Sequence, residues 1–162
     1  MAQCSSCFSR HQIAGACTTS VSKATKRGLS DEQIPVMVTR DRSGATLTEV
    51  MGDATAASIT RVLDPVVAKD VALVTDGAKA YRTFANATGR LHIALNASAG
   101  EHVCGTYHIQ NVNAYTSALK AWMARFKGVA TAYLPSYLGW HRLIEREGEG
   151  FTRLSCVAAA LT

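Results

Sequence analysis

The sequence predicts an α/β domain in which a mixed sheet is flanked by helices. Val71–Gly77 begins with a short apolar run, rich in β-branched residues, that is typical of a central strand buried on both faces. The alternating segments Ile34–Arg40 and Ala45–Met51 flank a polar turn, which predicts a hairpin. Apolar residues three and four positions apart predict a long amphipathic helix over Asn111–Lys127. Strands and helices that alternate in this way, in a chain of 162 residues, favour one layered domain.

The other predicted elements lie between and after these segments. In chain order they are a helix over 54–63, a helix over 78–88, a strand over 91–95, a loop over 96–107 and a helix over 137–147. Asp53 is expected to cap the first of these helices, and Gly89 is expected to end the second.

Charge and hydropathy divide the chain into three parts. Residues 1–30 contain no Asp or Glu and show no sustained period, so we interpret them as a poorly ordered basic arm. Residues 31–150 form the predicted domain, and residues 151–162 form a short C-terminal tail. The net charge of +5 leans towards a polyanionic partner. No apolar run approaches the roughly 18 residues that cross a bilayer. A signal-peptide core is also absent, so we expect a cytoplasmic protein without a membrane partner.

Four potential zinc ligands lie close together near the N-terminus. Cys4, Cys7, His11 and Cys17 fall within fourteen residues, which is about the span of a zinc knuckle. The histidine is one place away from the common spacing, and a tail with reducible thiols is the simpler interpretation. We therefore do not expect structural zinc, although a small zinc-binding adaptor stays an alternative. Five cysteines without paired spacing also argue against a disulfide framework.

Two polar features stand beside the predicted core. Asp76 follows the central strand directly, and ligands of layered α/β domains gather at the carboxyl ends of such strands. The alternative is that Asp76 simply caps the next helix. Asn113, Lys120 and Lys127 are seven residues apart, so they form a ridge beside the buried stripe of the long helix. A solvated helix flank would have the same pattern.

The order of elements resembles the ribonuclease H-like fold, with a first strand missing before Ile34. The chain also contains, in order, Lys26–Ser30, Ile34–Val36, Arg40–Gly44, Val74–Gly77 and His108–Asn113, the last followed by Lys120. These motifs resemble those of ISXO-like insertion-sequence DDE transposases, in which Asn can replace the third acid and Lys follows seven residues later. The resemblance covers residues 23–147, and residues 1–22 do not share it.

This resemblance implies metal-dependent cleavage and transfer of DNA strands during transposition, within a partial catalytic domain over residues 31–150. Asp76 would be the second acid and a metal ligand, and Asn113 would supply the third ligand to Mg²⁺ or Mn²⁺. Lys120 would hold a DNA phosphate, with Lys127 and Arg125 as further DNA contacts. His108 would orient the attacking group, or would merely be packed. The implied partner is DNA, both insertion-sequence ends and target, and homo-oligomerisation stays open.

The chain departs from the family pattern at the first acid. That residue should lie on a strand before the hairpin, but residues 1–30 offer no carboxylate. Asp31 and Glu32 belong to the lead-in of the hairpin and Asp41 belongs to its turn, so none of them is placed to replace it. We therefore expect an N-terminally truncated and catalytically impaired transposase. The alternative is a non-catalytic DNA-binding remnant.

Overall fold

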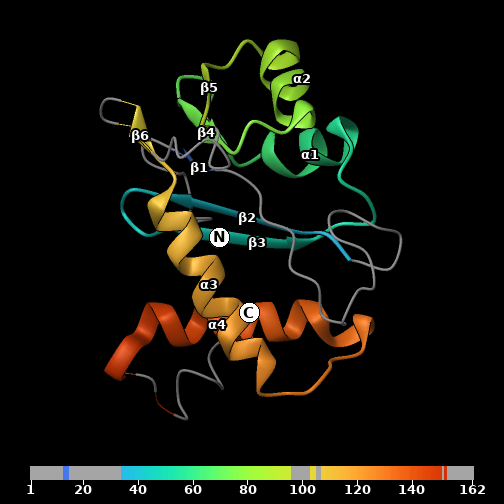
Figure 1. Cartoon of the computed structure of the whole chain (residues 1–162), viewed down its shortest axis with the longest axis vertical. Coiled ribbons are helices and arrows are strands. Elements are labelled where there is room, and N and C mark those ends of the chain that lie inside the picture. Colours follow the sequence, from blue (N-terminus) through green and yellow to red (C-terminus); the bar gives the residue numbers. More distant parts are fainter. Residues whose placement is uncertain (1–12, 15–33, 96–102, 105–106, 151, 153–162) are drawn as a thin grey trace, which may run out of the picture.

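The predicted α/β class is confirmed by a fold built on a five-stranded mixed sheet (Figure 1). This computed structural model describes residues 13–14, 34–95, 103–104, 107–150 and 152. Its strands are β1 (Ile13–Ala14), β2 (Val36–Asp41), β3 (Thr46–Val50), β4 (Leu73–Thr75), β5 (His92–Ala94), β6 (Val103–Cys104) and β7 (Tyr107–His108). Its helices are α1 (Ala56–Leu63), α2 (Lys79–Thr88), α3 (Gln110–Ala124), α4 (Leu134–Glu147) and the 3-10 helices η2 (Thr131–Tyr133) and η3 (Gly148–Gly150). The strand order in the larger sheet is β3-β2-β1-β4-β5.

The predicted hairpin is confirmed as β2 and β3, which pair antiparallel from Val36 opposite Val50 to Arg40 opposite Thr46. Asp41 is the last residue of β2 rather than part of the turn, and its side chain is buried. Its carboxylate accepts hydrogen bonds from Ser43 Oγ and from the backbone N–H of Ala45, both at 2.8 Å. The Asp41 side chain therefore stabilises the turn of this hairpin.

β1 occupies the middle of the sheet, where the sequence predicts no strand. It pairs antiparallel with β2, with Ile13 opposite Asp41, and parallel with β4, with Ala14 opposite Val74. The expectation that the first strand is missing is therefore wrong. Two paired residues are too few to show a strand period, so the sequence pattern does not reveal β1. The possible zinc ligands Cys4, Cys7, His11 and Cys17, the rest of the proposed basic arm and the tail from 153 lie outside the described residues.

Each face of the larger sheet has its own core. One cluster joins strand residues such as Val38 and Val74 to α3 and α4. The other joins Met37 and Leu73 to residues of α1 and α2. Neighbouring residues of one strand belong to different clusters because side chains alternate between the faces. Figure 1 shows α1 and α2 grouped near β4 and β5, with α3 and α4 at the other end of the molecule.

The two helices of the second cluster largely follow prediction. α2 ends at Gly89, whose left-handed conformation (φ +69°) and N–H bond to the Ala85 carbonyl close the helix as expected. α1 begins two residues later than predicted, because its N-cap is Thr55 rather than Asp53. Thr55 Oγ1 accepts a hydrogen bond from the Ser58 N–H at 3.3 Å, while Asp53 accepts hydrogen bonds from Thr55.

The C-terminal half differs from prediction in three places. α3 ends at Ala124, and i−3 hydrogen bonds tighten the chain up to Lys127, whose φ is +52°. α4 begins at Leu134 instead of 137, because Pro135 is tolerated in the first turn. Part of the loop predicted at 96–107 is a ribbon, in which β6 and β7 pair antiparallel. Within the described residues, no helix has the length and apolar character needed to cross a bilayer.

Candidate functional site

Asp76 directly follows β4, a strand whose three residues are fully buried. Its side chain is exposed, and Oδ1 accepts a hydrogen bond from the backbone N–H of Ala78 at 3.3 Å. Asp76 is not the N-cap of α2, because Ala78 holds that position. Among the described residues Oδ2 has no hydrogen-bond partner, so one carboxylate oxygen is available to a ligand.

α3 has two different polar flanks beside its buried stripe. The stripe is confirmed and consists of Val112, Tyr115, Thr116, Leu119 and Trp122. At 100° per residue, Asn113 and Lys120 lie on one flank, and Asn111 and Ala118 lie on the other. The side chains of Asn113 and Lys120 are exposed and have no partner within the described part of the chain. The first flank therefore carries an amide and an ammonium group that the fold does not use.

The sheet face that packs on α3 is also the face towards which Asp76 should point. Val74 belongs to the cluster that contains Ile109 and Val112 from the start of α3. Asp76 stands two residues after Val74, and side chains two apart along a strand share a face. The elements that carry Asp76 and Asn113 are thus packed in one cluster. The distance between their side-chain oxygens stays a prediction.

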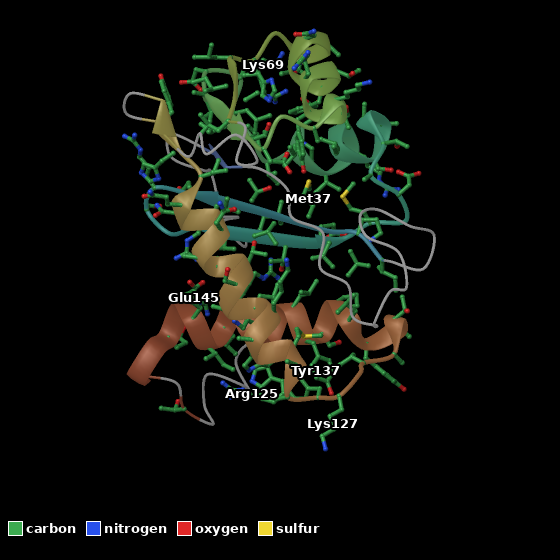
Figure 2. All side chains as sticks on the ribbon, viewed as in Figure 1. Met37, Lys69, Arg125, Lys127, Tyr137 and Glu145 are labelled. Carbon is green, nitrogen blue, oxygen red and sulfur yellow. The ribbon has the colours of Figure 1, made fainter. Side chains whose placement is uncertain are left out.

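The other predicted site residues lie at the two ends of α3. His108 is in β7, just before the helix, and its Nδ1 is buried without a hydrogen-bond partner among the described residues. Arg125 and Lys127 follow the helix and are exposed. Figure 2 shows both of them at the α3–α4 end of the molecule, with the Lys127 side chain extending outwards. No described contact joins His108, Arg125 or Lys127 to Asp76.

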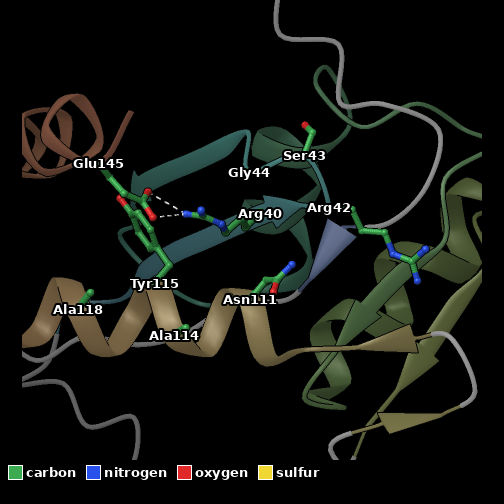
Figure 3. Close-up of a pocket in the computed structure, with 9 residues that line it drawn as sticks. All are labelled: Arg40, Arg42, Ser43, Gly44, Asn111, Ala114, Tyr115, Ala118 and Glu145. Carbon is green, nitrogen blue, oxygen red and sulfur yellow. Dashed lines mark hydrogen bonds and ion pairs between the residues drawn. The ribbon is translucent and has the colours of Figure 1, made fainter. Parts of the chain in front are cut away.

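A cavity of about 480 Å³ lies against the second flank of α3, away from these residues. Its lining includes the hairpin turn, the flank of α3 and Glu145 of α4. Arg40 Nη1 donates to both carboxylate oxygens of Glu145, at 2.6 and 2.7 Å, and to Thr46 Oγ1 at 3.1 Å. In Figure 3 the Arg40 side chain points towards Glu145, whereas Arg42 points away from this pair. The lining of the cavity therefore includes an ion pair between Arg40 and Glu145.

An aromatic residue connects this ion pair to the core. The Arg40 guanidinium lies 5.3 Å from the centre of the Tyr115 ring, and the Tyr115 hydroxyl lies 3.2 Å from His141 Nδ1. Burial, followed by the negative charge of Glu145, raises the pKa of Tyr115. Burial lowers the pKa of His141, an effect that Glu145 opposes. Both groups are therefore neutral near pH 7 and serve to pack α3 against α4.

The side-chain oxygens of Asp76 and Asn113 are of the type that a hard cation prefers. Asp76 offers a free carboxylate oxygen, and Asn113 offers an unpaired amide oxygen. Groups of three His, Cys, Asp or Glu side chains that could hold a metal are absent among the described residues. The donors fit Mg²⁺ or Mn²⁺ in kind, but they are fewer than a two-metal site uses.

Thr75 and His92 interact beside Asp76, and no sequence pattern singles them out. Thr75 Oγ1 lies 2.8 Å from His92 Nε2 and accepts a hydrogen bond from the Gly77 N–H at 3.1 Å. Burial, and then the positive charge of Arg82, lower the pKa of His92, so its ring is neutral near pH 7. The pairing depends on the register of β4 against β5, which the sequence does not reveal.

A family model described as the ISXO2-like transposase domain matches residues 13–140. The match begins at β1, ten residues before the resemblance that the motifs alone define, so the statement that residues 1–22 lie outside it is wrong for 13–22. No curated protein sequence matches the chain.

Proposed function

Because the chain belongs to the ISXO2-like transposase domain family, we propose that it is an insertion-sequence transposase domain with impaired catalysis. Its reaction would be metal-dependent cleavage and transfer of DNA strands. The observation that carries this proposal is the match over most of the chain, combined with a carboxylate at the end of β4 beside α3. The alternation of strands and helices alone would not point to DNA chemistry, because one fold serves many functions.

We also propose that the fold is ribonuclease H-like. The order β3-β2-β1-β4-β5 supports this proposal, with an antiparallel hairpin on one side of β1 and two parallel strands on the other. β1 supplies the strand whose absence was the main objection to this assignment. The long helix α3 after the last strand fits the same order.

Asp76 and Asn113 would hold a Mg²⁺ or Mn²⁺ ion. When bound, such an ion activates the attacking hydroxyl and stabilises the charge on the phosphate. Asp76 would provide the charged ligand from a fixed strand end, and Asn113 would provide a neutral oxygen. A neutral amide should bind the ion more weakly than a carboxylate would.

The position of the first acid supports impaired catalysis. β1 is the strand next to β4, and its two residues, Ile13 and Ala14, have no carboxylate. Asp41 cannot replace the missing acid, because it is level with Leu73, three residues before Asp76. That offset is about 10 Å along the strands, with two strand spacings, about 10 Å, across the sheet.

DNA binding would depend mainly on phosphate contacts. Lys120 lies about 10 Å further along α3 than Asn113, so it could hold a phosphate near the metal. Arg125 and Lys127 would extend this contact beyond the end of the helix. His108 would orient the attacking group from its place before α3.

A second candidate function is that of a non-catalytic DNA-binding remnant. The lack of a carboxylate on β1 favours it, since DNA affinity does not require the metal site. Both candidates bind DNA, and only the first cuts it.

A cleavage assay with supercoiled plasmid and either Mg²⁺ or Mn²⁺ tests these proposals, alongside DNA binding measured by fluorescence anisotropy. The impaired transposase predicts salt-sensitive binding, no strand transfer and no more than a trace of nicking, which Asp76→Ala removes; the remnant predicts the same binding with no nicking at all. Nicking that Asp76→Ala leaves unchanged, or none at all, would favour the remnant. Robust cleavage that Asp76→Ala abolishes would contradict impaired catalysis, and a chain that does not bind DNA would contradict both candidates.

A further inference from the structure

The residue before Asp76 takes part in a hydrogen-bond network that crosses two strands. Thr75 is fully buried, yet its hydroxyl has two partners: His92 Nε2 on β5, at 2.8 Å, and the N–H of Gly77, at 3.1 Å. The histidine lies opposite Leu73 in the ladder, so the contact to Thr75 runs diagonally between the strands. This geometry ties the end of β4 to its neighbour through side chains as well as through the backbone.

Asp76 lies between the two backbone points that this network holds. Thr75 fixes the backbone before it, and the N–H bond from Gly77 fixes the backbone after it. Gly77 has a φ of +85°, and a Cβ at this position would lie 3.5 Å from the Cβ of Ala94. The positive φ favours glycine at this position, and the hydrogen bonds of the Thr75 hydroxyl hold the backbone on both sides of Asp76.

The histidine completes the hydrogen bonding of Thr75. The Gly77 N–H satisfies the Thr75 hydroxyl only as an acceptor, so His92 Nε2 is the described partner that can accept the hydroxyl proton. Because the ring is neutral near pH 7, it also adds no positive charge beside a carboxylate that is to receive a cation. These features favour a role in holding Asp76.

We propose that Thr75 and His92 are positioning residues, which hold the turn that presents Asp76 to a divalent cation. The metal-binding part of this inference rests on the proposed function. The hydrogen-bond network itself makes a separate prediction about the order of the turn.

Hydrogen exchange of the Gly77 and Ala78 amides in the full-length chain tests the network directly. Thr75→Val and His92→Ala should raise exchange at these two amides about tenfold, as expected for the loss of one hydrogen bond. His92→Gln, which keeps a polar group near the Nε2 position, should restore most of the protection. Thr48→Val is the matched control, because the buried Thr48 hydroxyl has no partner among the described residues.

The second readout is the binding of Mn²⁺ alone, which is monitored by paramagnetic broadening of the NMR signal of the Ala78 amide. We expect Thr75→Val and His92→Ala to weaken this binding several-fold, and Thr48→Val to leave it unchanged. Unchanged exchange at Gly77, or an equal rise at all sheet amides, would overturn the proposal. If the unsubstituted chain binds no Mn²⁺, the metal function fails, while local exchange at Gly77 still decides whether the pair holds the turn.

Discussion

Polar or charged residues lie beside both flanks of α3, but the two sets differ in what they contact. Beside one flank, Arg40 of β2 and Glu145 of α4 pair within 2.7 Å, and Arg40 lies over Tyr115. On the other flank Asn113 and Lys120 are exposed and have no partner among the described residues. The pairing of Arg40 with Glu145 is accounted for by its contribution to stability. The second arrangement leaves Asn113 and Lys120 exposed to solvent, on the side of α3 that we assign to metal and DNA.

The difference shows why charge alone is a poor guide to function. Arg40 and Arg42 line the cavity, and by sequence they would be good candidates for binding an anion. In the structure Arg40 pairs with Glu145, which leaves its guanidinium less available to a ligand. Charged and polar groups that the fold leaves unpaired are free to contact a ligand, so they are the better candidates for a functional assignment.

Truncating the buried stripe between the flanks should have the largest effect. Leu119 is fully buried in the α3 core, and Leu119→Ala should lower the free energy of unfolding by about 2–5 kcal/mol. The neighbouring change Lys120→Ala should alter it by less than about 0.5 kcal/mol. Chemical denaturation measures both. Equal losses from the two variants would show that α3 is not oriented as described.

Breaking the Arg40–Glu145 pair should have the next largest effect. Arg40→Met removes the hydrogen bonds to Glu145 and Thr46 and should cost about 1–3 kcal/mol of unfolding free energy. Arg61→Met, on an exposed position of α1, is the matched control and should cost little. A double-mutant cycle with Glu145→Gln isolates the pair, and no coupling between the two sites would contradict its stabilising role.

Removing the cations on the Lys120 side of α3 should change DNA binding rather than stability. Lys120→Ala combined with Lys127→Ala should weaken binding to duplex DNA about tenfold at low salt, and should reduce the salt slope by about 2. Arg61→Ala with Lys69→Ala removes the same charge far from α3, where Lys69 lies at the opposite end of the molecule (Figure 2), and serves as the control. An unchanged affinity in the first variant would make these lysines a solvated surface.

Acidification should produce the smallest effect. It should act through His141, which packs against Tyr115 beside the Arg40–Glu145 pair. Burial lowers the folded-state pKa of His141 below its ordinary value of 6.5, so the unfolded chain binds the proton first. Stability should therefore begin to fall near pH 6.5 and stop falling, for this group, below the folded-state pKa. His141→Gln should flatten the profile of unfolding free energy against pH. An unchanged slope would assign the pH dependence to other groups, His92 among them.

The sequence predicts those elements whose signals are local. The hairpin, β4, α2 and the buried stripe of α3 each follow from a short pattern of apolar residues and turn residues. β1 could not be predicted, because its two residues become a strand only by pairing with partners far along the chain. The Arg40–Glu145 pair spans 105 residues, and the contact from Thr75 to His92 depends on strand register. Asp76 and Asn113 could be proposed because family motifs carry them, while their separation depends on how α3 packs on the sheet.

The central claim is that Asp76 and Asn113 form the remaining part of a metal site whose first acid is absent. A crystal structure grown with Mn²⁺, in which anomalous scattering locates the ion, tests it most directly. We predict side-chain oxygens of the two residues within about 8 Å of each other, with Mn²⁺ contacting Asp76 and no carboxylate from β1. An ion bound elsewhere, or the two side chains on opposite sides of the sheet, would contradict the claim.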